Sequence, residues 1–169
     1  SVGTVALVAR RNGENDNDGV ASTMINSITI ALFSSFAATV FAIIFTDELI
    51  RLISSNQEVL KYGIPYLQIR FLGVVSMVLT AVYKGYFDSL KQTYIHMIAS
   101  IIINVLNIGL NYLLIYGKFG FPRLEVNGAA IATIISTYVG LAIMIGFSFK
   151  GEFYQKFKLY KIKNINWSV

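Results

Sequence analysis

Long apolar stretches recur along the chain and are separated by short polar connections. Each stretch has about 20 residues or more, the length that an α-helix needs to cross a hydrocarbon core of about 30 Å. Because the connections are too short to hold a separate soluble domain, the pattern predicts an all-α, polytopic bundle of transmembrane helices. The predicted spans are Val20–Phe45, Tyr62–Tyr83, Ile95–Tyr116 and Ala129–Phe149.

The opening segment Ser1–Ala9 is also apolar, but at about 1.5 Å per residue it covers only about half of a bilayer core. It has no initiator methionine and no basic region followed by a cleavage site, so a signal peptide is not expected. We therefore expect the sequence to begin inside a helix, as an internal fragment of a longer protein.

The third predicted span carries Asn104, Asn107 and Asn111, whose spacing places all three amides on one helical face. Hydrocarbon offers an amide no hydrogen-bond partner, so this face must contact protein or a wet cavity. Hydrogen bonds between helices would explain a single asparagine. Three on one face, preceded by Ser100 one turn earlier, favour the lining of a cavity.

Two other spans carry polar groups whose roles the pattern leaves open. The first span has Asn26 near one end, followed on the same face by Phe33 and Phe36. This face is either a vestibule for amphipathic molecules or an ordinary helix contact. In the second span, Pro65 is either in a first turn or a cause of a kink, and Arg70 is expected to snorkel outward rather than to pair within the bundle.

Small side chains recur at every fourth position of the last span. Such a ribbon lets two helix backbones approach closely in lipid, so we expect tight helix packing here rather than a ligand site. The ribbon consists of Gly128, Ala132, Ser136 and Gly140.

Positive charge is unevenly divided between the connections, and the net charge is +5. About nine Lys and Arg fall in Arg10–Asp18, Lys84–Thr93 and Lys150–Val169, against about four on the other side, so the positive-inside rule places the first group in the cytoplasm. The tail Lys150–Val169 alternates lysines with aromatic residues, which is typical of a segment at the lipid interface. It also suits a linker to a second membrane unit. No other basic stripe favours nucleic acid as a partner.

The composition excludes several classes of function. Hydrophobic residues make up 55% of the chain and charged residues 14%, and there is no cysteine, so neither a disulfide framework nor a thiolate site is expected. With one histidine and nine acidic residues, no metal site, catalytic residue or cofactor is predicted. A membrane-embedded transferase would need clustered acids or histidine, whereas Asp18, Asp88 and His96 are scattered.

The stretch NIGLNYLLIYGKFGFPRLEVNGAAIAT (Asn107–Thr133) closely resembles the fifth and sixth helices of the multidrug and toxic compound extrusion (MATE) transporters. GTVALVARRNGENDNDGVA (Gly3–Ala21) resembles the end of that family's second helix and the loop after it. YLQIRFLG (Tyr66–Gly73) and AVYKGYFDSLKQT (Ala81–Thr93) resemble the fourth helix and its following loop. The GKFGxP stretch and the Asn111–Tyr112 pair are most similar to the NorM-type bacterial branch.

The resemblance implies twelve helices in two six-helix lobes and export of amphipathic or cationic organic compounds in exchange for H⁺ or Na⁺. Residues 1–149 would be a partial N-lobe, from the end of helix two to helix six. Residues 150–169 would be a cytoplasmic interfacial linker toward the C-lobe. The expected partners are the C-lobe of the same protein, membrane lipid and small organic substrates. The expected location is a bacterial inner membrane. A lipid-linked saccharide flippase, which resembles MATE proteins in fold, is the alternative.

The resemblance also carries over candidate site residues. In relatives with an ion site in this lobe, helix five supplies an Asn and, four residues on, an Asp, and helix six supplies the Thr of its GAAIAT motif. The matching positions are Asn107, Asn111 and Thr133. Because position 111 is Asn, it cannot titrate. We expect these residues, with Asn104, to line a cavity or to orient a cation, a water or a helix-one carboxylate rather than to carry the proton.

Overall fold

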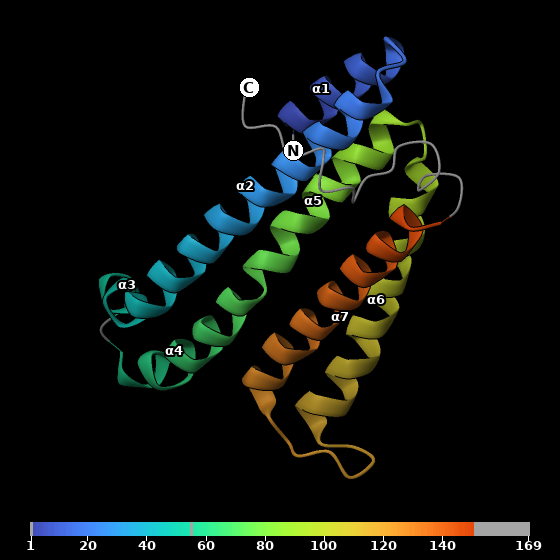
Figure 1. The fold of residues 1–169 in the computed structure, drawn as a ribbon. Helices are drawn as coiled ribbons and strands as arrows, with labels where there is room; N and C mark the ends of the chain where they lie inside the picture. The colour runs from blue at the N-terminus through green and yellow to red at the C-terminus, as the bar shows by residue number, and fades with distance from the viewer. Residues whose placement is uncertain (1, 55, 151–169) are drawn as a thin grey trace.

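The structure is a computed structural model that describes residues 2–54 and 56–150, which form helices joined by short turns (Figure 1). The helices are α1 (Val2–Gly13), α2 (Asn17–Ile44), α3 (Thr46–Ile53), α4 (Gln57–Leu72), α5 (Val74–Ser89), α6 (Thr93–Tyr116) and α7 (Glu125–Ser148). The predicted all-α fold class is confirmed. The predicted linker, apart from Lys150, lies outside the described residues.

Four helical segments are long and apolar enough to cross a membrane, in the same places as the four predicted spans. The first two begin earlier than predicted, and a polar side chain caps each of them. Asp16 accepts a hydrogen bond of 2.9 Å from the Gly19 N–H, and Asn56 accepts one of 2.9 Å from the Glu58 N–H. Capping satisfies N–H groups that the first helical turn leaves unpaired, so the helix starts before its apolar stretch. The observed spans are Asn17–Ile44, Gln57–Ser89, Thr93–Tyr116 and Glu125–Ser148.

Two features of the region around the first two spans were not predicted. The short helix α3 lies between the first two spans, where the sequence analysis expected only a connection. The second span is interrupted at Gly73, where α4 ends and α5 begins. Pro65 lies inside α4 without ending it, so the break occurs at the glycine rather than at the proline.

Apolar packing is concentrated at the end of the bundle where α1, α2, α5 and the start of α6 meet (Figure 1). Tyr86, Phe87 and Ile95 are fully buried there against Val20 and Met24. Away from this core, α2 and α4 diverge from the α6–α7 hairpin in Figure 1. Helix α7 packs on α6 and also contacts α4 and α5.

The turns alternate between the two ends of the bundle. The α1–α2 turn, the α5–α6 turn and the end of α7 lie at one end in Figure 1, and the α2–α3 and α6–α7 connections lie at the other. Two of the basic connections grouped by the sequence analysis, Arg10–Asp18 and Lys84–Thr93, therefore share one end, as expected for a chain that crosses a membrane repeatedly. Which end faces the cytoplasm stays a prediction.

The ribbon of small residues on α7 packs against α6, as predicted, and we call these four residues the small-residue seam: Gly128, Ala132, Ser136 and Gly140. A Cβ atom added to Gly128 would lie 2.7 Å from the Leu114 carbonyl oxygen, and one added to Gly140 would clash with the Ile103 side chain. The seam therefore sets the distance between the two backbones.

Candidate functional site

Three of the predicted site residues are joined by hydrogen bonds across α6 and α7. The Asn111 Nδ2 group donates to Asn107 Oδ1 at 2.9 Å, and Asn107 Nδ2 donates to Thr133 Oγ1 at 3.2 Å. Thr133 in turn donates to the carbonyl of Ala129 at 2.9 Å. The amides of α6 thus form a polar chain, Asn111–Asn107–Thr133, that ends on α7.

This polar chain ends in an unused acceptor. Asn111 Oδ1 is buried and has no hydrogen-bond partner among the described residues. A buried amide oxygen without a partner costs about 1–3 kcal/mol, so a donor or a cation is expected to meet it in the working protein. Asn104, the fourth candidate, is exposed and takes no part in the hydrogen bonds that join Asn107 to Asn111 and Thr133. The structure therefore separates Asn104 from the other two amides.

The predicted vestibule residues lie on α2, away from the polar chain. Asn26 is half-buried, whereas Phe33 is 76% exposed and Phe36 is 66% exposed. No described residue covers these two rings, so their role as a vestibule stays a prediction.

A second polar region, which the sequence analysis did not find, surrounds the break at Gly73. Interrupting a helix frees backbone carbonyls, and in lipid these must find donors. Side-chain hydroxyls from two neighbouring helices supply donors: Thr39 of α2 donates to the Phe71 carbonyl at 3.3 Å, and Tyr138 of α7 donates to the Leu72 carbonyl at 3.0 Å. Ser76 of α5 donates to the Gly73 carbonyl at 2.9 Å, which also accepts from the Met77 N–H at 3.1 Å. The buried Ser76 hydroxyl also lies 3.0 Å from Thr137 Oγ1 on α7.

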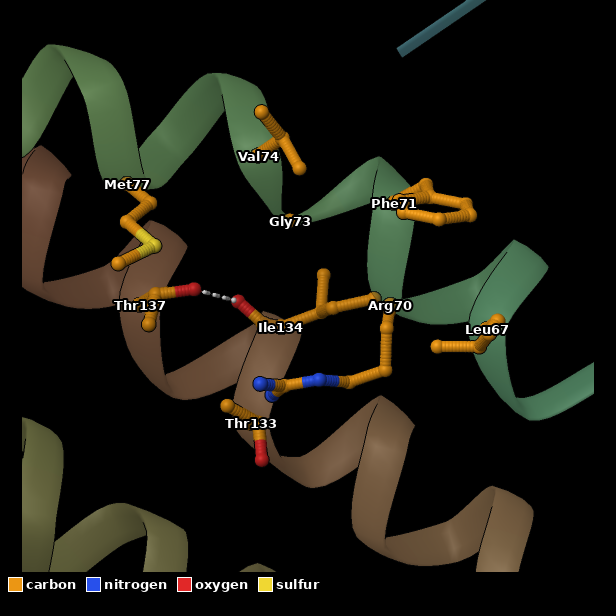
Figure 2. Close-up of a pocket in the computed structure, with 9 residues that line it drawn as sticks. All are labelled: Leu67, Arg70, Phe71, Gly73, Val74, Met77, Thr133, Ile134 and Thr137. Atoms are coloured by element: carbon orange, nitrogen blue, oxygen red, sulfur yellow. Dashed lines mark hydrogen bonds between the residues drawn. The ribbon is translucent and has the colours of Figure 1, made fainter. Parts of the chain in front are cut away.

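A cavity of about 300 Å³ lies between this break and α7. Its walls are largely apolar, and its polar groups are Arg70, Thr133 and Thr137 (Figure 2). Figure 2 shows the Arg70 side chain extending from α4 toward Thr133 on α7. The sequence analysis expected Arg70 to snorkel outward, whereas the structure places it along the cavity wall. The apolar lining consists of Leu67, Phe71, Gly73, Val74, Met77 and Ile134.

Thr133 connects the two polar regions. It accepts the hydrogen bond from Asn107 on one side and lines the Arg70 cavity on the other. The sequence could have pointed to this cavity, since Arg70 is the single charged residue between Lys61 and Lys84. A charge at that depth is a functional candidate by default.

The described residues contain no group of three or more His, Cys, Asp or Glu side chains that could hold a metal ion. Lys84 and Asp88, one turn apart on α5, form an ion pair of 3.7 Å.

Comparisons with known proteins support the family resemblance of this sequence. The chain is 33% identical over 156 residues to the "Probable multidrug resistance protein NorM" of Thermotoga maritima, an alignment that covers 92% of this chain and 33% of that protein. A Bacillus cereus protein of the same name is 27% identical, with 94% and 35% covered. The chain thus spans about a third of the length of these curated relatives.

The fold agrees with solved structures as well. A structure described as the "Inward-facing conformation of a multidrug resistance MATE family transporter of the MOP superfamily" superposes with a TM-score of 0.82 at 24% identity, covering 97% of this chain and 38% of that chain. The family model described as MatE matches residues 1–113. The family consists of transporters rather than enzymes, and its members named here are membrane proteins. The chain belongs to the MatE family of transporters, and it is similar to NorM-named bacterial members of that family.

Proposed function

We propose that this chain forms part of the N-lobe of a multidrug efflux transporter, from the end of helix two to helix six. In this assignment α1 is the end of helix two, α2 is helix three, α4 and α5 together are helix four, and α6 and α7 are helices five and six. The order of the helices and the share of the NorM-named relatives that the chain covers support the assignment. Residues 150–169 then lead toward a C-lobe.

The proposed activity is the outward transport of amphipathic or cationic organic compounds in exchange for H⁺ or Na⁺, across a bacterial inner membrane with the tail in the cytoplasm. The observation that carries the proposal is the polar chain on α6 and α7. Asn111, Asn107 and Thr133 form continuous hydrogen bonds within two spans, and Asn111 Oδ1 is left as a buried acceptor. Polar groups that are maintained at membrane depth usually serve an ion or substrate path.

Mechanistically, the polar chain suits an ion that binds transiently. A cation or a protonated group that meets Asn111 Oδ1 would gain an oxygen ligand in one arrangement of the helices and lose it in another. Such differential affinity is what allows an ion to shift the balance between inward-facing and outward-facing states. Because Asn111 does not titrate, a charge that changes at this end of the polar chain belongs to the ion or to another group that meets Asn111 Oδ1.

The flippase alternative has weaker support. A pyrophosphate headgroup requires several cations around the lumen, and within the described spans Arg70 is the one arginine that lies far from both ends of its span.

Transport in everted membrane vesicles tests the proposal. Vesicles containing the complete transporter should accumulate a fluorescent organic cation when a H⁺ or Na⁺ gradient is imposed, and collapsing that gradient should stop accumulation. Vesicles without the transporter provide the baseline. Equal dye movement in both preparations under either gradient would contradict the proposed activity.

A further inference from the structure

Arg70 lies near the middle of its span. The continuous apolar segment Gln57–Ser89 has 33 residues, and its central residue is Gly73. At about 1.5 Å per residue, Arg70 is about 5 Å from that centre along the axis. A charge at this depth requires water, a partner of opposite charge or a bound ligand, because hydrocarbon solvates it poorly.

No carboxylate of the described chain compensates this charge. Each described Asp and Glu lies in a turn or in the first or last turn of a helix. The ion pairs among the described residues join Arg10 to Glu14, Lys84 to Asp88 and Arg123 to Glu125. Arg70 takes part in none of them. Its exposed side chain extends instead over the cavity toward Thr133 (Figure 2).

The other polar groups of the cavity cannot serve as donors to a ligand without breaking existing bonds. Thr133 donates its single hydroxyl proton to the Ala129 carbonyl, and Thr137 donates its proton to the Ile134 carbonyl. A guanidinium has five N–H donors and no acceptor. The donors that remain free in the cavity are therefore those of Arg70, and they select an acceptor with negative charge.

The walls define the rest of the ligand. Leu67, Met77 and Ile134 contribute apolar surface, and the volume of about 300 Å³ is at the lower end of the range for small-molecule sites. A cavity of this kind holds an apolar body next to one anionic head. A carboxylate suits the fork of a guanidinium, since both of its oxygens can accept from two parallel N–H groups.

We propose that the cavity between α4, α5 and α7 binds the carboxylate, or a similar oxyanion, of an amphipathic organic molecule, with Arg70 as the binding residue. The proposal rests on the proposed transport function and adds to it a site that recognises the anionic group of a substrate. A side-chain carboxylate from another part of the transporter would satisfy Arg70 by the same chemistry, and the experiment distinguishes these two sources.

The experiment uses the complete transporter and three probes: dansylaminoundecanoate, its uncharged methyl ester, and ethidium as an organic cation. Binding of the two dansyl probes to purified protein is followed by fluorescence, and transport of all three is followed in everted vesicles. Arg70→Gln removes the charge, and Arg70→Lys keeps the charge without the fork. Arg51→Gln is the matched control, because Arg51 is an exposed arginine on α3 outside the cavity.

We expect Arg70→Gln to weaken carboxylate binding at least about ten-fold, since a charge-assisted bidentate contact is lost. Binding of the methyl ester and transport of ethidium should change less than about two-fold, Arg70→Lys should be intermediate, and Arg51→Gln should match wild type. Equal losses for the carboxylate and its ester would overturn the proposal, because the cavity would then not recognise charge. A loss of ethidium transport and of folded protein in both Arg70 variants would also overturn it, in favour of an internal ion pair. If the wild type transports nothing, the proposed function fails, while the binding measurements still decide the role of Arg70.

Discussion

Helix α7 has two faces that pack in opposite ways. On one face, the small-residue seam brings the backbone of α6 so close that a methyl group at Gly128 would meet the Leu114 carbonyl at 2.7 Å. On the other face, Thr133, Ile134 and Thr137 border a cavity of about 300 Å³ beside a broken helix. The first contact stabilises a fixed helix pair. The second retains space, polar groups and an interrupted backbone, which are features that binding and movement require.

The largest effect is expected on the closely packed face. Gly128→Leu should strongly reduce the yield of folded protein, because the new side chain meets backbone that cannot move aside. Overpacking typically costs about 1–3 kcal/mol of stability. Because the atom in the way is the Leu114 carbonyl oxygen of the backbone, we expect a loss near the upper end of that range. Gly146→Leu is the matched control on the same helix, since nothing lies within 4 Å of a Cβ added there. Size-exclusion profiles and thermal melts in detergent give the measurement, and equal stability of the two variants would contradict the seam.

A several-fold effect on transport is expected at the polar chain between the two faces. Asn111→Leu removes the amide that contacts Asn107 and the free oxygen Oδ1. Membrane hydrogen bonds are worth only about 0.6–2 kcal/mol, so expression should stay near normal while efflux falls several-fold. Asn104→Leu, an exposed amide on the same helix, should have a smaller effect. Efflux of a fluorescent cation from cells, normalised to surface expression, provides the measurement.

The same position also tests ion coupling. Asn111→Asp introduces a titratable group beside the carboxylate expected from helix one, and repulsion between like charges should raise the pKa of one member of that pair. The pH profile of transport should therefore differ from that of the wild type. An unchanged profile, together with normal transport by Asn111→Leu, would identify the polar chain as packing only.

A smaller effect is expected at the broken helix. Ser76→Ala removes a buried hydroxyl that contacts the Gly73 carbonyl and Thr137. Losing such a bond should lower stability by about 1 kcal/mol, seen as a modest decrease in melting temperature. Ser34→Ala, which removes a comparable bond to the Ala31 carbonyl on an exposed part of α2, is the control. A larger decrease in the control would mean that the break at Gly73 does not depend on this hydroxyl.

The orientation of both faces in the membrane is tested by labelling rather than by energetics. This chain contains no cysteine, so single cysteines can be introduced at Phe119 in the α6–α7 connection and at Glu14 in the α1–α2 turn, on a cysteine-free background. An impermeant maleimide added to intact cells should label position 119 and not position 14. The reverse pattern would invert the proposed orientation.

The sequence predicted the regular parts of the fold well. Hydrophobicity alone located the spans, and the every-fourth spacing of small residues identified the seam, because both signals are local and periodic. The spacing of Asn107 and Asn111 on one helical face was equally readable. Helix α3 was missed because it lies in the charged connection between two predicted spans, where no helix was expected. The break at Gly73 was missed because it does not interrupt the apolar pattern of the sequence.

The composition and periodicity of this sequence determined that the chain is a bundle of membrane-spanning helices with polar groups inside it, because hydrocarbon requires helices and penalises unpaired amides. Only the tertiary structure decided which of those groups meet. It joined Asn107 to Thr133, left Asn104 apart and aimed Arg70 at α7 rather than away from the bundle. These outcomes depend on how closely α7 approaches α6 and α4, and that distance is set by contacts between residues far apart in the chain.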